Sequence, residues 1–549
     1  MPSALLETPD LLSVKAEAIA SEFELGSDHV RRIASHFIKQ MSERHPRVLC
    51  LMRITDSNLG DGLSNQRAWQ IPAFVKNMPT GTETGKFLAV DLGGSNCRIC
   101  LVHLHGNHTF TIVQSKHKVP SDVMVNPSYR PLFAFVAQKI ADFLLVHSDS
   151  HGNHTHYRLG FTFSFTCHQT SLLRGTLIHW DKGWDIPEAV GKDPCAMLQE
   201  AIDLLGLPVL VAVLANDSVG TLLTRAYTLG QKGSTLGAVI FGTGTNAAYV
   251  ENLEKIHRLG DAGGYAGGIM VVNTEWGCLD DEMQVLPSTR YDDELDELSA
   301  DPGSQMFEKR VSGLYLGELL RLAILHLIRA GALKFKVQAS SPVFRHHALD
   351  SSLLSKLANI EDEDYELAAT VVEETLEAEL VGPDEAQAIC LLASAIARRA
   401  ARLAGAALAA VVIQSGRLER PATSPEAVNA NLSAYTSADA CSTWRQKAHH
   451  FYYSKKLLLS SSLRFLLNLS STIPVHDLPK PDSQGGQGEI IDFGADGSLI
   501  EFYPTFEMDM RIALREIPEI GLIGERRIQI GLAKDGSGVG AALMAQSAM

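Results

Sequence analysis

The sequence lacks the features that would place this protein in a membrane or outside the cell. No stretch approaches the ~18 uninterrupted apolar residues that a membrane-spanning helix needs. Residues 1–20 carry acidic side chains before any apolar run and have no basic start of a secretion signal. The eight cysteines are scattered, without the regular spacing of a disulfide framework. We therefore expect reduced thiols and a cytoplasmic protein. These features do not exclude a further nuclear or mitochondria-associated pool.

Positive charge is also scarce, because the formal net charge is −15. An acidic chain disfavours a nucleic-acid-binding surface or a basic membrane-binding face, so we expect neither nucleic acid nor membrane as a partner. An anionic ligand would need donors placed locally. The 549 residues, 45% hydrophobic and 20% charged, exceed one typical core and predict a folded protein of two or more domains.

The common nucleotide-binding motifs are missing as well. GTETGKF at 81–87 has the wrong spacing for a P-loop, and the protein-kinase motifs are absent. The chain instead has three short glycine turns, in FLAVDLGGSNCRICLVHL (87–104), LGAVIFGTGTNAAYV (236–250) and QIGLAKDGSGVGAALMAQ (529–546). Glycines let the backbone approach a ligand closely, and Ser, Thr and Asn offer hydrogen bonds, which suits phosphate. The first two turns sit in similar hairpins, which indicate either a duplicated α/β unit or two unrelated hairpins.

Two local patterns have both a structural and a chemical interpretation. LPVLVAVLANDSVGTLLTRAY (207–227) predicts a buried strand followed at once by a helix. Asp217 at that junction is well placed for chemistry, but taken alone it is better explained as a helix N-cap. Cys97 and Cys100 form a CxxC inside a predicted strand, where residues three apart point to opposite faces. We interpret these two cysteines as packing residues.

Other segments are predicted from their periodicity. Residues 29–41 and the Ala-rich 384–416 predict helices, and 492–514 predicts a strand, a turn and a helix. Residues 418–487 fit no clear amphipathic period and are interpreted as an insertion or a long surface loop.

Ordered blocks along the chain resemble the hexokinase family of sugar kinases. They run from LAVDLGGSNCR (88–98) through GFTFSF (160–165), WDKGWDI (180–186), LANDSVGTL (214–222), IFGTGTNAAYVE (240–251), VNTEWGCLDD (272–281), LPSTRYDDELDELSADPGSQMFEKRVSGLYLGELLRL (286–322) and GADGSLIEFYPTF (494–506) to AKDGSGVGAAL (533–543). The resemblance extends from about residue 25 to the end, omitting the segment around 420–487. It implies an α/β fold with two lobes, actin-like or ribonuclease H-like, and an active site in the cleft between the lobes.

The resemblance also implies a domain plan. Residues 1–82 would provide N-terminal helices that pack on the large lobe, and 83–215 would form the small lobe. The large lobe would span 216–525, with the irregular insertion at 418–487, and 526–549 would return to the small lobe.

The activity implied by the resemblance is transfer of phosphate from ATP, with Mg²⁺, to the 6-hydroxyl of glucose or a related hexose. Asp217 would be the general base and Lys182 would supply positive charge. The sugar would contact Ser164, Asp181, Lys182, Asn216, Asp217, Asn246, Glu275 and Glu308. The nucleotide would contact Asp91, Gly93, Gly94, Ser95, Asn96, Arg98, Gly242, Thr243, Gly244, Gly536, Ser537 and Gly538. Mg²⁺ would arrive bound to ATP without a dedicated protein cage, and the protein would be a monomer or a homodimer.

Several positions depart from the family pattern. Thr166 stands where the sugar segment has a proline, Asp181 replaces a threonine, and residues 45–64 make a longer link than usual. These departures keep a second class open, a hexokinase-like sugar-binding regulator of the carbon or nutrient response with weak or no kinase activity. The compositions of 45–64 and 418–487 would also fit translated non-coding sequence.

We predict that Asp181→Thr raises sugar affinity or turnover. A carboxylate beside Lys182 attracts the ammonium group away from the sugar, and it cannot donate a hydrogen bond as a hydroxyl does. One such hydrogen bond is worth on the order of 1 kcal/mol, a several-fold change in affinity. Sugar affinity and kcat of the two proteins test this directly. Values that agree within a factor of two would mean that the site already accommodates Asp181.

Overall fold

We describe the protein from a computed structural model, which covers residues 11–42, 69–94, 96–147, 156–180, 183–230, 235–256, 267–361, 363–418 and 490–548. The chain divides into two compact units, 419–489 and the remainder. The predicted insertion at 418–487 lies outside the described residues except for Leu418, and so does the long link at 45–64. All that follows concerns the larger unit.

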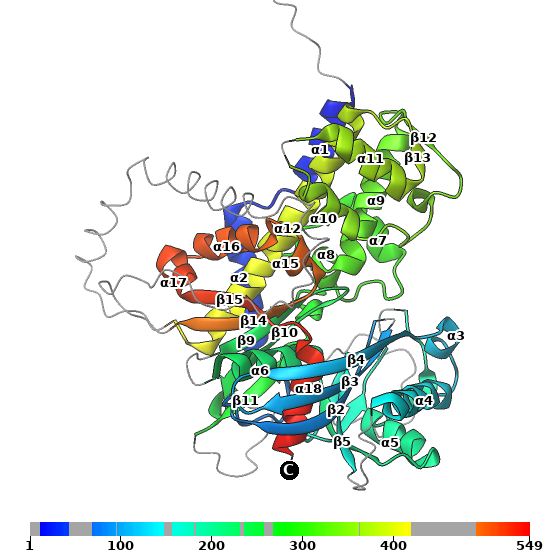
Figure 1. The fold of residues 1–549 in the computed structure, drawn as a ribbon. Coiled ribbons are helices and arrows are strands. Elements are labelled where there is room, and N and C mark those ends of the chain that lie inside the picture. Colours follow the sequence, from blue (N-terminus) through cyan, green and yellow to red (C-terminus); the bar gives the residue numbers. More distant parts are fainter. Residues whose placement is uncertain are drawn as a thin grey trace, which may run out of the picture. The chain divides into compact units, whose positions relative to one another are not determined.

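The first sheet is five-stranded, in the order β4-β3-β2-β5-β8 (Figure 1). Strands β2, β3 and β4 form an antiparallel meander, whereas β5 and β8 run parallel to β2. The bounds are β2 Thr84–Gly93, β3 Asn96–His105, β4 Phe110–Lys118, β5 Tyr157–Phe163 and β8 Val209–Ala215. The first predicted hairpin is therefore β2 and β3.

The second sheet repeats this plan, because its strands β11-β10-β9-β14-β15 follow the same order and directions. A short strand, β1, extends it beside β11. The bounds are β1 Ile71–Pro72, β9 Thr235–Phe241, β10 Thr245–Asn252, β11 Ile269–Asn273, β14 Ile491–Asp496 and β15 Ile528–Leu532. The matching orders favour the duplicated α/β unit over the alternative of two unrelated hairpins. Two small ribbons complete the strands, β6 Cys167–Gln169 with β7 Gly175–Leu177 and β12 Lys336–Val337 with β13 Ala378–Glu379.

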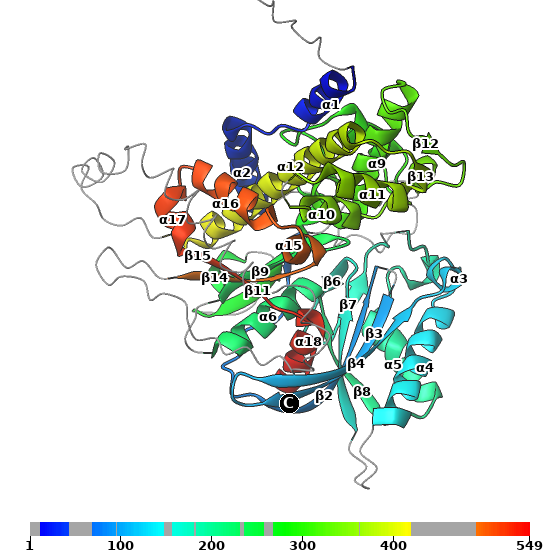
Figure 2. The ribbon, with the colours of Figure 1, turned by 45° about the horizontal axis from the view of Figure 1, so that its top comes forward.

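Helices cover both faces of each sheet (Figures 1 and 2). Those before β9 are α1 Leu11–Glu22, α2 Ser27–Ser42, α3 Ser121–Met124, α4 Arg130–His147, α5 Pro194–Leu204 and α6 Asp217–Leu229. Between β11 and β14 lie α7 Arg290–Glu297, α8 Glu308–Val311, α9 Gly313–Arg329, α10 Ser352–Ala358, α11 Tyr365–Leu376 and α12 Pro383–Ser415. The last are α15 Ser498–Phe502, α16 Phe506–Glu516, α17 Gly521–Arg527 and α18 Gly536–Ser547. No helix among the described residues is long and apolar enough to cross a bilayer.

The buried apolar side chains form three clusters that define the layers. One lies between the first sheet and helices α4 and α5, and a second lies between the second sheet and α1, α2, α9, α12 and α16. The third fills the space between the two sheets and contains α6 and α18. Cys97 belongs to the first of these clusters and Cys100 to the third, so the two thiols do point to opposite faces of β3. Burial raises the pKa of each thiol to about 12, which fits packing residues.

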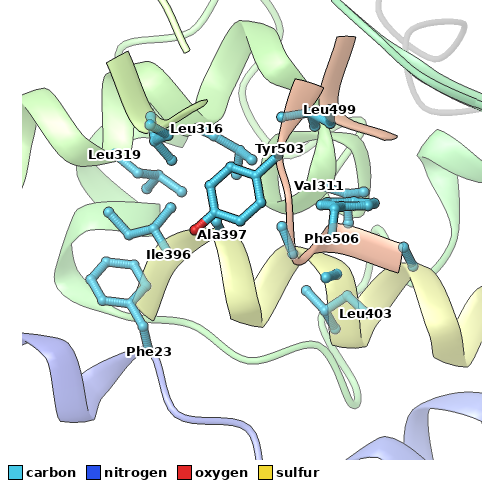
Figure 3. Packing of buried hydrophobic residues seen from close by; sticks show 14 of the residues in the cluster. Phe23, Val311, Leu316, Leu319, Ile396, Ala397, Leu403, Leu499, Tyr503 and Phe506 are labelled. Carbon is cyan, nitrogen blue, oxygen red and sulfur yellow. The ribbon is translucent and has the colours of Figure 1, made fainter. Parts of the chain in front are cut away.

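The predicted Ala-rich helix is α12, which is buried along most of its length. Small side chains let neighbouring helices approach it closely, and Figure 3 shows Tyr503 and Phe506 against Ala397 and Leu403. Arg399 is buried in this helix and makes two hydrogen bonds of 2.7 Å to the Asp292 carboxylate. The pair satisfies a charge that would otherwise be very costly to bury.

Helices α6 and α18 cross with their backbones in contact between the two sheets. A Cβ built on Gly540 would lie 2.1 Å from the Gly220 Cα, and one on Gly536 would lie 2.8 Å from the Thr221 Cα. The Thr224 hydroxyl donates to the Gly536 carbonyl at 2.9 Å. Helix α6 follows the first sheet but packs on the second, whereas α18 follows the second sheet but packs on the first. The third glycine turn predicted from the sequence is instead the first helical turn of α18. Its glycines serve a different purpose, because they allow the close crossing with α6.

We predict that Gly540→Ala destabilises the protein by about 3 kcal/mol or more, because its methyl group would overlap backbone that cannot move without separating the helices. Gly538→Ala is the matched control in the same helix, since its Cβ would lie 3.4 Å from the Cys100 Sγ, an ordinary contact. Thermal unfolding of the two variants checks this. Equal melting temperatures would contradict the backbone contact.

Candidate active site

Several of the predicted ligand-binding residues lie at or just after the ends of parallel strands. In the first sheet, β2 ends at Gly93, and Ser164 and Asn216 come directly after β5 and β8. The carboxyl ends of parallel strands share one edge of a sheet, where ligands commonly bind. In the second sheet, β14 ends at Asp496 beside β9, which leads into the glycine turn 242–244.

The first glycine turn is a tight hairpin closed by the pair Gly93 and Asn96. Gly94 has a φ of +55°, in the left-handed region that favours glycine. A Cβ on Gly93 would come within 2.9 Å of the Ser164 Cβ, and the Trp184 indole donates to the Gly94 carbonyl at 2.5 Å. The turn is therefore held against the segments that carry the predicted sugar residues.

Arg98 connects this hairpin to the start of α18. It lies opposite Asp91 in the β2–β3 pair and donates to the Asp91 Oδ2 from Nε at 3.0 Å and from Nη2 at 2.5 Å. The Ser537 hydroxyl donates to the same oxygen at 2.9 Å and accepts from Arg98 at 2.8 Å. Arg98 also lies 3.4 Å from Asp535. The structure thus brings together the first and third groups of predicted nucleotide residues.

The second glycine turn is held by its neighbours on two sides. The Gly242 and Thr243 carbonyls accept from the first amides of α9, Gly313 at 2.8 Å and Leu314 at 3.1 Å, and the Gly242 amide donates to the Gly244 carbonyl. On the other side, Gly497 packs closely against the end of β9. A Cβ built on Gly497 would lie 2.3 Å from the Phe241 carbonyl carbon. Its φ of +114° also requires glycine.

A chain of amides and a carboxylate joins the predicted sugar residues. Asn246 donates to Asn273 at 2.9 Å and to Asn216 at 3.4 Å, and Asn273 donates to the Glu275 carboxylate at 2.8 Å. Glu275 adopts a left-handed backbone conformation, with φ of +49°. Glu308 is buried and accepts from the Thr245 amide at 2.9 Å, one residue before Asn246. Asn216, Asn246, Glu275 and Glu308 are therefore gathered in one polar region.

The helix cap at the start of α6 is Asn216. Its side chain accepts from the Ser218 amide at 2.9 Å and from the Ser218 hydroxyl at 2.7 Å. The interpretation of Asp217 as the cap is therefore wrong, since Asp217 is the first helical residue. Its Oδ1 also accepts from the Ser218 amide at 2.7 Å. Asp217 is half-buried beside the Asn216–Asn246 contact.

Three of the predicted residues, Ser95, Asp181 and Lys182, lie outside the described residues. Conversely, sequence reasoning did not assign Asn273 or Asp496 to the site. Each lies within one of the family-like blocks, 272–281 and 494–506, at the end of a strand. Both depend on partners elsewhere in the chain. Asn273 accepts a hydrogen bond from Asn246, and Gly497, which follows Asp496, packs against Phe241 and Gly242.

Asp496 is a carboxyl group of this region whose pKa is strongly shifted. Burial raises its pKa to about 6, although a hydrogen bond of 2.7 Å from the Gly497 amide and the charge of Arg98 oppose the shift. The negative charges of Asp217 and Asp535 raise the pKa further. Asp496, Asp217, Arg98 and Asp535 therefore interact electrostatically, although they come from different elements.

Two sheets of matching order, glycine turns beside their strand ends and an amide-carboxylate network define an α/β protein of the sugar-kinase class. Family models described as "Hexokinase" match residues 15–227 and 236–547. The chain is 38% identical to the glucokinase of Aspergillus niger, covering 99% of this chain and 97% of that protein. It is 35% identical to glucokinase-1 of Saccharomyces cerevisiae, covering 96% of each.

The chain therefore belongs to the hexokinase family. A solved structure of hexokinase from Schistosoma mansoni complexed with glucose matches 98% of this chain and 99% of that one, with a TM-score of 0.73 at 26% identity. The family and the two-lobed α/β sugar-kinase fold expected from the sequence are confirmed.

We predict that Asp496→Asn stabilises the protein at pH 7.5 and that this gain shrinks as the pH falls toward 5. The folded pKa of about 6 lies above the ordinary value of 3.8, so folding favours the protonated form, and wild-type stability falls as pH rises through this window. Asparagine can still accept from the Gly497 amide but carries no charge. We expect a gain on the order of 1–3 kcal/mol at pH 7.5.

Thermal unfolding between pH 5 and 8 measures the difference, with Asp535→Asn as a control for a carboxylate of the same group that forms an ion pair with Arg98. A difference between Asp496→Asn and wild type that does not vary with pH would contradict the raised pKa.

Proposed function

We propose that this protein is an ATP-dependent hexokinase that phosphorylates the 6-hydroxyl of glucose or a related hexose. The observation that carries the proposal is the polar chain from Asn216 through Asn246 and Asn273 to Glu275, which lies beside Asp217 at the end of β8. Membership of the hexokinase family supports the reaction class. We further propose a cytoplasmic monomer or homodimer.

In the proposed reaction, Asp217 accepts the proton of the sugar 6-hydroxyl as that oxygen forms a bond to the γ-phosphorus of ATP. The bond from the γ-phosphorus to the bridging oxygen breaks, and ADP leaves with the electron pair. Asp217 suits this role because Asn216, and not Asp217, is the cap of α6. Asp217 is half-buried just after the end of β8. Lys182 would stabilise the negative charge that develops on the transferred group.

The sugar would bind through the amides and carboxylates of Asn216, Asn246, Glu275 and Glu308, with Ser164 and Asp181 contributing from the first lobe. Amides and carboxylates can each take several hydrogen bonds from neighbouring hydroxyls. A site built this way rejects analogues that lack a hydroxyl, because its own buried polar groups would remain unpaired.

The phosphates of ATP would lie between the first two glycine turns, with Arg98 as the cation and Ser537 at the start of α18 as a further donor. The fit rests on open backbone in both turns, because a Cβ built on Gly94 would meet no described atom within 4 Å and one on Gly242 would come no closer than 3.7 Å to another atom. Mg²⁺ bound to ATP would neutralise phosphate charge, and the strand-end carboxylates Asp91 and Asp496 offer the oxygen ligands that this ion prefers.

A second candidate is a sugar-binding regulator with weak or no kinase activity. The departures at Thr166 and Asp181 favour it, because both fall in the segments proposed to hold the sugar. The two candidates share hexose binding and differ in turnover, so one assay separates them.

We predict that Asp217→Asn lowers kcat by about 10²- to 10⁴-fold, the usual contribution of a general base, while hexose affinity changes little. Asparagine keeps an acceptor for the Ser218 amide, and Asn216 still caps α6, so the fold should persist. A coupled assay of ADP release with glucose, fructose and mannose measures turnover, and calorimetry measures sugar binding.

Asp193→Asn is the matched control, because Asp193 caps α5 and lies outside the proposed site. We expect its kcat to equal that of wild type. Wild-type turnover no higher than that of Asp217→Asn would contradict the enzyme and favour the regulator, and failure to bind any hexose would contradict both candidates.

A further inference from the structure

Thr166 has a buried hydroxyl that the fold leaves unsatisfied. The residue lies in the connection between β5 and β6 and is 1% exposed. Its backbone carbonyl accepts from the Ile178 amide at 3.0 Å. Its Oγ1, in contrast, is buried and has no hydrogen-bond partner in the structure of the described residues. An unpaired buried hydroxyl is unfavourable, and most such groups in folded proteins have a partner.

The surroundings of Thr166 belong to the proposed sugar site. Ser164, two residues earlier on the same connection, lies against Gly93 of the first glycine turn. The Phe165 ring packs on Trp180 and Trp184, with ring centroids 4.7 and 5.1 Å apart. The hydrogen bond from Ile178 then joins Thr166 to the segment that leads to Asp181 and Lys182. Thr166 thus lies where two proposed sugar-binding segments meet.

A buried threonine with a satisfied hydroxyl lies nearby for comparison. Thr162 of β5 is also fully buried, and its Oγ1 donates to the Ser537 carbonyl at 3.1 Å. The Thr162 hydroxyl therefore forms a hydrogen bond within the fold, whereas the Thr166 hydroxyl forms none among the described residues. A hydroxyl can both donate and accept a hydrogen bond. It therefore suits the hydroxyl groups of a polyol, which also do both, better than the oxygens of an anion, which only accept.

We propose that Thr166 is a specificity-determining residue whose hydroxyl forms a hydrogen bond with one hydroxyl of the bound hexose. The inference rests on the proposed function, since it needs a hexose in this site. In this proposal, a hydroxyl of the sugar is the hydrogen-bond partner that the Thr166 hydroxyl lacks within the described fold. Losing this hydroxyl should then weaken sugar binding without weakening the fold.

The test compares Thr166→Val, Thr166→Ser and Thr162→Val with wild type, using glucose binding without ATP. Quenching of tryptophan fluorescence can report binding, because Trp180 and Trp184 are buried next to Phe165. We expect Thr166→Val to bind glucose about tenfold more weakly, on the scale of one hydrogen bond, and to keep or raise its melting temperature. Thr166→Ser should bind within twofold of wild type.

Thr162→Val should behave in the opposite way, with a lower melting temperature and unchanged glucose affinity. A series of monodeoxy glucose analogues then identifies the contacted hydroxyl. For one analogue, wild type and Thr166→Val should bind equally, because the partner hydroxyl is missing from the sugar. Nucleotide affinity should not differ between them.

The inference is wrong if Thr166→Val binds glucose within twofold of wild type, or if it loses the same factor for every analogue. A lowered melting temperature of the sugar-free variant would also overturn it, since that would show a structural role. Wild type that binds no hexose would instead contradict the proposed function, so the two failures can be told apart.

Discussion

The backbone contact between α6 and α18 is the constraint on which the rest of the structure depends. Gly220 and Gly540 leave no room for a side chain at the crossing, so the helices can approach as closely as their backbones allow. Each helix follows the last strand of one sheet and packs on the other sheet. The chain therefore exchanges helices between its two halves, and neither sheet can bury its inner face without the helix supplied by the other.

This crossing also positions the candidate site, because both helices begin close to it. Helix α6 starts at Asp217, three residues before Gly220, and α18 starts at Gly536, four residues before Gly540. Contacts of Gly536 with Thr221 and Thr224 fix the two starts relative to each other. The proposed general base on α6 and Ser537, which binds Asp91 and Arg98, are consequently held by a contact that involves no ligand-binding side chain.

The sequence predicts what depends on near neighbours. Alternating apolar runs predicted both hairpins, and the strand followed by Asn216 and Asp217 predicted the junction of β8 and α6. The first helical turn of α18, at Gly536, was taken for a separate glycine turn, because glycine spacing does not reveal that another backbone lies against it. Asn216 was not recognised as the cap, since two adjacent polar residues can each fill that role. The hydrogen bonds of Asn273 and the close approach of Gly497 to Phe241 depend on contacts between distant segments, which no local pattern encodes.

The two carboxyl groups at the strand ends, Asp91 and Asp496, have different surroundings. Asp91 is neutralised by Arg98 and hydrogen-bonded by Ser537. Within the part of the chain that the structure describes, Asp496 forms no such ion pair, and burial raises its pKa to about 6, so it takes up a proton in mildly acidic solution. The charges of Asp217 and Asp535 are among the causes of this shift, so the pKa of Asp496 depends on carboxylates from two other elements. Negative charge at the strand ends is thus reduced in two ways, by an ion pair at Asp91 and by a raised pKa at Asp496.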